Sequence, residues 1–181
     1  MIYYKPIELD YYDIIVKKCL TYVKTNDTIY SRLTPATSWY NLNLEILKRI
    51  CPELDVAFQK YDLIISMAAA FVMYNSNHAS VHIDAFPSQA RINIPLLNCA
   101  NTYTNFYVSD SEPNLRIDPN TGIKSFYITG NYELVDRVEI TQATVIRTKA
   151  PHSVDLPINN PVPRITLTLG FNKDPVFLLD T

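Results

Sequence analysis

The chain has 181 residues, and its 16 basic and 18 acidic side chains give a formal net charge of -2. This balance excludes a broad basic footprint for duplex nucleic acid, and the absence of GxGxxG and GxxxxGK(S/T) motifs excludes the usual glycine-rich phosphate loops. Three widely spaced cysteines and no apolar run of about 18 residues argue against a disulfide framework, a thiolate zinc site or a membrane segment, so we expect a cytoplasmic protein.

The first third of the chain shows helical patterns. Apolar residues recur at helix-like spacing over residues 10–24, which predicts an amphipathic helix with Asp10 as its N-cap. The same spacing recurs over residues 42–61, where Pro52 predicts a break into two short helices. We therefore expect residues 1–62 to form a helical support for a sheet that follows.

From residue 63 onward the sequence consists of short runs rich in β-branched and aromatic residues, separated by polar corners. Such runs predict a mainly β fold, an antiparallel jelly-roll or double-stranded β-helix barrel of the cupin-like kind, over residues 63–175. With the helices, residues 1–181 then form a single domain. The predicted strands are LIISMAAAFVMY, ASVHID, ARINIPLL, TYTNFYV, KSFYIT, YELVDRVEI, ATVIRT and RITLTLGF.

A His-x-Asp tripeptide in one of these strands is the first candidate for chemistry. Residues two apart in a strand point to the same face, so His82 and Asp84 project together. His152, which directly follows the strand ATVIRT, is the candidate for a second histidine, and two imidazoles with one carboxylate suit iron(II). Taken alone the tripeptide is weak evidence, because an isolated histidine is more often a hydrogen-bonded structural residue.

Arg164 adds weight to this site. It opens the strand RITLTLGF, in which Arg164 and Thr166 share one face and the aliphatic residues share the other. On the inward face of a barrel, a guanidinium would be an unpaired buried charge unless an anion meets it. A guanidinium grips a carboxylate with two hydrogen bonds, and 2-oxoglutarate offers such a group. The alternative is that Arg164 points outward and pairs with a surface acid.

The motifs HID, APHSV and RITLTLGF together resemble the iron(II)/2-oxoglutarate-dependent oxygenase superfamily, and most closely its small phage-encoded prolyl-hydroxylase-like and phytanoyl-hydroxylase-like members. The likeness covers about residues 70–172. It implies a hydroxylase that uses O2 and couples oxidation of its substrate to the decarboxylation of 2-oxoglutarate to succinate and CO2, acting in the host cytoplasm if phage-encoded. It also implies that iron is bound by His82, Asp84 and His152, and 2-oxoglutarate by Arg164 and Thr166.

Several weaker candidates remain open between two interpretations. Asn93, with Arg91 and Pro95 in ARINIPLL, either lines the pocket or faces solvent, because these three residues alternate with Ile92, Ile94 and Leu96. In TYTNFYV one of two alternating sets of side chains surrounds 2-oxoglutarate while the other packs, and Tyr103 and Tyr107 are candidates, although aromatic residues more often belong to the core. The polar stretch 109–122, expected as an exposed loop, and segment 75–80 are candidates for the border of the substrate entrance.

Two other classes of protein share these features. One is a cupin-like metal enzyme that does not use 2-oxoglutarate, and the other is a catalytically silent jelly-roll that serves as a binding or virion module. Arg164 favours the oxygenase, because an isomerase has no need for an arginine and threonine on the barrel wall. The sequence leaves the substrate open among a protein side chain, a nucleobase and a small metabolite, and it does not indicate the oligomeric state.

Overall fold

The structure is a computed structural model that describes residues 1–26, 38–74, 80–117 and 124–180. In these ranges the strands form two antiparallel sheets, which we call sheet A and sheet B. Sheet A runs in the order β1 (Tyr4–Pro6), β10 (Thr144–Arg147), β5 (Ala90–Leu97), β12 (Arg164–Phe171), β3 (Ile65–Met73) and β2 (Ser38–Asn41). Sheet B runs in the order β7 (Asn114–Ile117), β8 (Lys124–Tyr127), β4 (His82–Asp84), β11 (His152–Asp155), β6 (Tyr103–Val108) and β9 (Glu133–Glu139).

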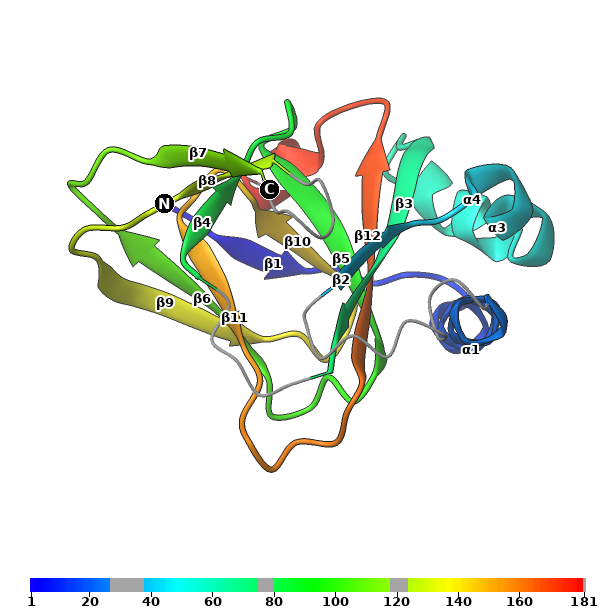
Figure 1. Cartoon of the computed structure of the whole chain (residues 1–181). Coiled ribbons are helices and arrows are strands. Elements are labelled where there is room, and N and C mark those ends of the chain that lie inside the picture. Colours follow the sequence, from blue (N-terminus) through cyan, green and yellow to red (C-terminus); the bar gives the residue numbers. More distant parts are fainter. Residues whose placement is uncertain (27–37, 75–79, 118–123, 181) are drawn as a thin grey trace.

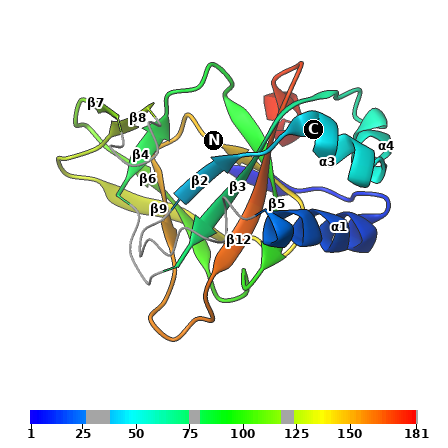
Figure 2. The same ribbon diagram turned by 45° about the vertical axis from the view of Figure 1, so that its right-hand side comes forward.

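The two sheets face each other, and the helices cover the other side of sheet A (Figure 1). The helices are α1 (Tyr12–Thr25), α3 (Leu44–Ile50) and α4 (Glu53–Gln59), and a 3-10 turn, η1 (Pro175–Leu179), follows the last strand. Helix α1 lies alongside β5 and α3 alongside β3 (Figure 2). The sequence-based prediction of a mainly β jelly-roll with helices at its N-terminus is therefore confirmed.

The main core lies between the helices and sheet A. Ile15 and Cys19 on α1, Leu47 on α3 and Phe58 on α4 are fully buried against the sheet. The aliphatic faces of β5 and β12 meet them, and burial of this apolar surface contributes roughly 25 cal/mol per Å². The sheet residues in this layer are Ile92, Ile94, Ile165, Leu167 and Leu169.

This packing decides which side chains point toward sheet B. Because Ile165, Leu167 and Leu169 face the helices, Arg164, Thr166 and Thr168 face the space between the sheets. The register carries the same pattern to the neighbouring strand, where Asn93 pairs with Thr168 and Pro95 with Thr166. A polar wall on the inner face of sheet A follows.

The N-terminal third differs from the prediction in two respects. Helix α1 begins at Tyr12, and its N-cap is Tyr11 in a left-handed conformation with a φ of 61°. Asp10 forms a salt bridge with Lys60 at 3.2 Å, so it is not the N-cap. Residues 1–62 are also not purely helical, because β1 and β2 extend sheet A at its two edges. The predicted break at Pro52 is confirmed, since α3 ends at Ile50 and α4 begins at Glu53.

The polar stretch 109–122 was expected as a loop, but it contains strand β7. This strand is an edge of sheet B with four exposed residues. Leu115 and Ile117 alternate with polar residues, but the run of four residues is too short to stand out in a polar stretch. Residues 118–122 and 75–79 lie outside the described residues.

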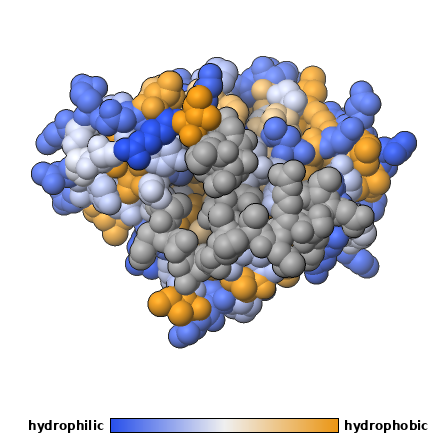
Figure 3. Space-filling view, viewed as in Figure 1, coloured by the Kyte–Doolittle hydropathy of each residue, from blue (hydrophilic) through white to orange (hydrophobic). Residues whose placement is uncertain are grey.

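Hydrophobic and hydrophilic side chains are interspersed over the surface at the left of Figure 3. No helix in the described ranges is both long and apolar enough to cross a membrane.

Candidate metal and carboxylate site

Two neighbouring strands of sheet B bring His82, Asp84 and His152 together. The first two residues lie two apart on β4 and share its inner face, and His152 on β11 is the direct cross-strand partner of His82. The rings of the two histidines are 4.5 Å apart. Their Nε2 atoms lie 3.6 Å and 3.9 Å from Oδ1 of Asp84. All three candidate ligand atoms lie within 4.8 Å of one another.

Hydrogen bonds to the main chain orient both imidazole rings. Nδ1 of His82 lies 2.8 Å from the carbonyl oxygen of Ser80, and Nδ1 of His152 lies 2.9 Å from that of Ala150. A carbonyl oxygen only accepts, so Nδ1 carries a proton in each ring and Nε2 is the nitrogen that faces the candidate metal position. This is the arrangement in which metal-binding histidines are usually held, with the second nitrogen fixed by a hydrogen bond.

The pKa shifts of two of the three groups favour metal binding near neutral pH. Burial lowers the pKa of His152 to about 4, and the nearby His82 contributes to this shift, so His152 is neutral. Burial alone would raise the pKa of Asp84, but His82, whose Nε2 lies 3.6 Å from Oδ1, and the guanidinium of Arg91 hold the pKa below its usual range. Burial also works against the charged form of His82, but Asp84 outweighs it and raises the pKa of this imidazole.

The donor set fits a divalent transition metal. Three donors about 2.1 Å from one ion in a facial arrangement would lie about 3 Å apart, so shifts of up to about 1 Å in each side chain close the site. Two imidazole nitrogens and one carboxylate oxygen are the ligands of non-haem iron(II) sites that keep open positions. His82, Asp84 and His152 would hold such an ion.

Arg164 lies inside the barrel, as expected for an anchor of an acid. It is the largest side chain among the fully buried ones, with 2% exposure, and its Nε donates to Oγ1 of Thr102 at 3.0 Å. Thr102 in turn donates to the carbonyl oxygen of Cys99 at 2.7 Å, so its hydroxyl is fixed as the acceptor. Nη1 of Arg164 is buried and has no hydrogen-bond partner among the described residues. Burial lowers the pKa of Arg164, but a guanidinium stays protonated in proteins.

Two further predicted residues also face the interior. Thr166 is 2% exposed, and its hydroxyl lies 3.7 Å from the sulfur of Cys99. Asn93 is the cross-strand partner of Thr168, and its side-chain oxygen is buried without a hydrogen-bond partner in the described part of the chain. Of the two interpretations of Asn93, the structure thus supports the one in which it faces inward.

The structure does not bring Tyr103 and Tyr107 to the site. Phe106 is fully buried as the cross-strand partner of His152, so the alternating tyrosines of β6 point to the outer face of sheet B. There the hydroxyl of Tyr107 lies 3.0 Å from that of Ser153, and the guanidinium of Arg137 lies 3.7 Å from the ring of Tyr103. Tyr103 and Tyr107 therefore do not line the space between the sheets, and the expectation that they surround 2-oxoglutarate is wrong.

Two residues that the sequence places only as members of an alternating set have defined contacts in the structure. Thr102, which precedes β6, holds Arg164, and Arg91 lies 4.0 Å from Asp84. The alternation that places Phe106 inward also places Thr102 and Thr104 inward. Knowing which face of β6 points inward would therefore have identified Thr102 as a residue of the site.

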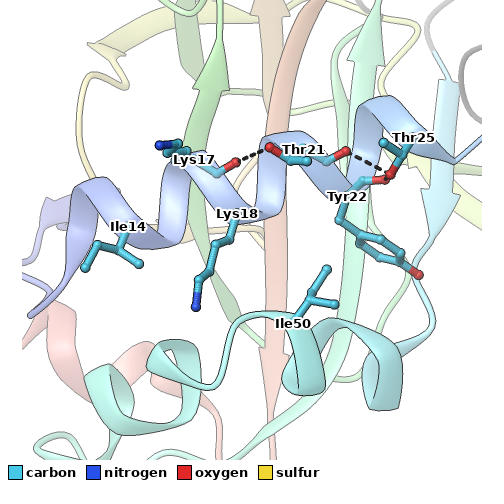
Figure 4. A pocket seen from close by; sticks show the side chains of 7 residues that line it. All are labelled: Ile14, Lys17, Lys18, Thr21, Tyr22, Thr25 and Ile50. Atoms are coloured by element: carbon cyan, nitrogen blue, oxygen red, sulfur yellow. Dashed lines mark hydrogen bonds between the residues drawn. The ribbon is translucent and has the colours of Figure 1, made fainter.

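A separate pocket of about 500 Å³ lies on the helical side of the molecule, between α1 and α3 (Figure 4). Its walls include Ile14 and Ile50 and the stems of two lysines. The charged end of Lys18 forms a salt bridge with Glu53 at 2.7 Å, and the hydroxyl of Thr21 donates to the carbonyl oxygen of Lys17. This pocket holds no converging acid, base or metal ligand among the described residues, so we assign the chemistry to the interior of the barrel.

No protein-family model and no curated protein matches the chain. Among solved structures, it is similar to HygX from Streptomyces hygroscopicus with nickel and 2-oxoglutarate bound, at a TM-score of 0.52 and 9% identity over 93% of this chain and 81% of HygX. The L-ribose isomerase of Cellulomonas parahominis, with no ligand, matches at a TM-score of 0.35 and 12% identity over 91% and 84% of the two chains, which is too loose to compare sites. The likeness to HygX shows a shared jelly-roll fold.

Proposed function

We propose that the protein is a non-haem iron(II) oxygenase that uses 2-oxoglutarate and O2 and most simply acts as a hydroxylase. The observation that carries this proposal is the buried Arg164, whose Nη1 atom has no hydrogen-bond partner among the described residues. Its strand β12 forms the barrel wall opposite the cluster of His82, Asp84 and His152. A buried guanidinium with an unmatched donor is costly unless an anion meets it. The nickel and 2-oxoglutarate held by the structural neighbour HygX support the same choice.

Each residue then has a definite role. His82, Asp84 and His152 hold the ion, and the main-chain bonds at the Nδ1 atoms keep the two imidazoles in the binding tautomer. A bound iron(II) supplies the activation of O2 that couples the oxidation of a C–H bond to the decarboxylation of 2-oxoglutarate.

Arg164 binds the distal carboxylate of 2-oxoglutarate, and Thr102 fixes the guanidinium in place by accepting from Nε. Thr166 presents a hydroxyl on the same face of β12. Phe106, fully buried beside His152, forms an apolar wall that keeps water from the reacting atoms.

The test is an anaerobic titration of the iron(II) protein with 2-oxoglutarate, followed by the weak visible charge-transfer band and by calorimetry. The wild type should show the band and bind saturably, whereas Arg164→Gln should keep its metal affinity and bind 2-oxoglutarate at least about tenfold more weakly. Arg137→Gln is the matched control, because this arginine lies on the outer face of sheet B against Tyr103.

The outcomes separate the competing functions. Metal binding without any response to 2-oxoglutarate would favour a cupin-like enzyme of another kind, and failure to bind metal after reconstitution would favour a silent binding module. If both bind, substrate-dependent formation of succinate in fractions of cell extract, with iron(II) and ascorbate, identifies the substrate. The relation to phage-encoded members and the cytoplasmic location remain predictions.

A further inference from the structure

The barrel contains a second buried guanidinium that the metal and 2-oxoglutarate sites do not use. Arg91 on β5 is 3% exposed, and its Nε and Nη1 atoms are buried without a hydrogen-bond partner among the described residues. Asp84 faces it, but Oδ2 is 4.0 Å from Nε, which is too long for a hydrogen bond. A buried cation with unmatched donors is favourable only when an anion meets it.

Aromatic rings define how an anion reaches Arg91. The guanidinium carbon lies 3.8 Å from the centroid of the Phe86 ring and 5.4 Å from that of Trp39, and the two rings stack on each other at 6.2 Å. The N–H bonds of a guanidinium lie in its plane, so a ring against its face leaves the donors for an acceptor in that plane. A carboxylate can accept two parallel hydrogen bonds from donors in this plane.

Arg91 and Arg164 lie at opposite ends of the inner face of sheet A. Asn93, two residues after Arg91 on β5, pairs with Thr168 on β12. Arg164 lies on β12 four residues before Thr168. Because the strands are antiparallel, the two arginines are six strand positions apart, about 20 Å along the strands. Arg91 lies beside Asp84 instead, so it serves a different part of the site.

The charged groups of the barrel interior do not cancel when a divalent ion and 2-oxoglutarate are bound. Asp84 with Arg91 and Arg164 has a net charge of plus one, to which a divalent ion adds two and 2-oxoglutarate contributes minus two. One positive charge therefore remains in the loaded site. Lys149, whose Nζ donates to the carbonyl oxygen of Asp84 at 2.9 Å, adds a further positive charge at the same edge.

We propose that Arg91 binds a carboxylate of the substrate and thereby selects an organic acid, either a free acid or the acidic side chain of a peptide. This inference rests on the proposed function, because the adjacent metal ligands make the position a reaction site. Arg91 would hold the acid while Phe86 and Trp39 flank the rest of the molecule.

The test uses the protein loaded with nickel and 2-oxoglutarate. Acetate, benzoate and the blocked residue N-acetyl-glutamate methylamide are titrated against their neutral amides, followed by calorimetry and by the fluorescence of Trp39, the single tryptophan of the chain. At least one acid should bind about tenfold more tightly than its amide, Arg91→Gln should abolish this preference and Arg91→Lys should retain part of it. Arg137→Gln is the control, because it removes an arginine that stacks on a ring outside the barrel.

The results distinguish this inference from the proposed function. Intact binding of nickel and 2-oxoglutarate with no preference for any acid over its amide overturns the inference alone. Arg91→Gln that weakens nickel binding and leaves acid binding unchanged also overturns it, since Arg91 would then only support Asp84. An acid preference that depends on Arg91, in a protein that binds no 2-oxoglutarate, contradicts the proposed function instead.

Discussion

His152 is the direct cross-strand partner of His82, with the two rings 4.5 Å apart, and the Nε2 atom of each lies within 4.0 Å of Oδ1 of Asp84. The pairing of β4 with β11 thus creates the candidate metal centre through backbone register alone. The strands would hold the ligands close together ahead of metal binding, which reduces the reorganisation that binding requires.

Asp84→Asn should remove most of the metal affinity. The substitution keeps the shape of the side chain and removes the anionic ligand, so nickel should bind about a hundredfold more weakly in a calorimetric titration. Asp110→Asn, at an exposed position, is the control and should bind nickel like the wild type. Equal affinities in the two variants would show that Asp84 is not a ligand.

Metal affinity should rise with pH because a proton competes for His82. Burial disfavours the charged form of His82, but the carboxylate of Asp84, 3.6 Å from Nε2, outweighs it and raises the pKa of His82. The ring must lose this proton before Nε2 can bind a metal. Below that pKa, nickel affinity should fall up to about tenfold per pH unit, with release of one proton. His152 adds no proton in this range, since its pKa is about 4.

Calorimetry between about pH 8 and about pH 6, in buffers with different ionisation enthalpies, measures both the affinity and the proton release. A constant affinity with no proton release over this range would contradict the assignment of His82 as a ligand.

Thr102→Val should weaken the binding of 2-oxoglutarate without affecting the metal. The hydroxyl that accepts from Nε of Arg164 is lost, so the guanidinium is no longer fixed and a second buried donor is left without a partner. We expect about three- to tenfold weaker binding of 2-oxoglutarate and a loss of about 1–3 kcal/mol in the free energy of unfolding. Thr168→Val, on the same face of β12 but away from Arg164, is the control, and an equal effect of both changes would exclude a specific role for Thr102.

The sequence predicts the direction of side chains best where the aliphatic residues of a strand must face a core. In RITLTLGF the three aliphatic residues must face a core, which leaves Arg164 and Thr166 on the inner face, as the structure has them. The alternation in Val81-His82-Ile83-Asp84 likewise places a histidine and a carboxylate on one face of the strand.

Other features depended on contacts that the sequence does not display. TYTNFYV has aromatic residues on both faces, so only the burial of Phe106 reveals the phase, and the choice of Tyr103 and Tyr107 failed. The environment of Arg91 requires Phe86 from a loop and Trp39 from a distant strand. Strand β11 has only four residues and follows Pro151, so its sequence shows no alternation long enough to predict a strand.

Leu167→Ala should destabilise the fold and leave the metal site intact. Leu167 is fully buried at the centre of β12, paired with Ala70 on β3 and Ile94 on β5, and it faces the helices. The cavity should lower the free energy of unfolding by about 2–5 kcal/mol in urea denaturation, with unchanged nickel affinity of the folded protein. Ile64→Ala, at a position 59% exposed, should change the stability by no more than about 0.5 kcal/mol. A comparable loss in both variants would contradict the assignment of this layer as the main core.

Tyr107→Phe tests which face of β6 lines the site. The hydroxyl of Tyr107 contacts that of Ser153 on the outer face of sheet B, whereas Phe106 faces His152. Removing the hydroxyl should therefore change the affinity for 2-oxoglutarate by less than about twofold and cost about 1 kcal/mol of stability, the usual value of one hydrogen bond. Phe106→Ala is the counterpart, because it opens the wall beside His152 and should weaken nickel and 2-oxoglutarate binding in calorimetry as well as stability. If Tyr107→Phe lowered 2-oxoglutarate affinity as strongly as Arg164→Gln, β6 would have to present its other face to the ligand, and the assignment of the inner wall of sheet B would be wrong.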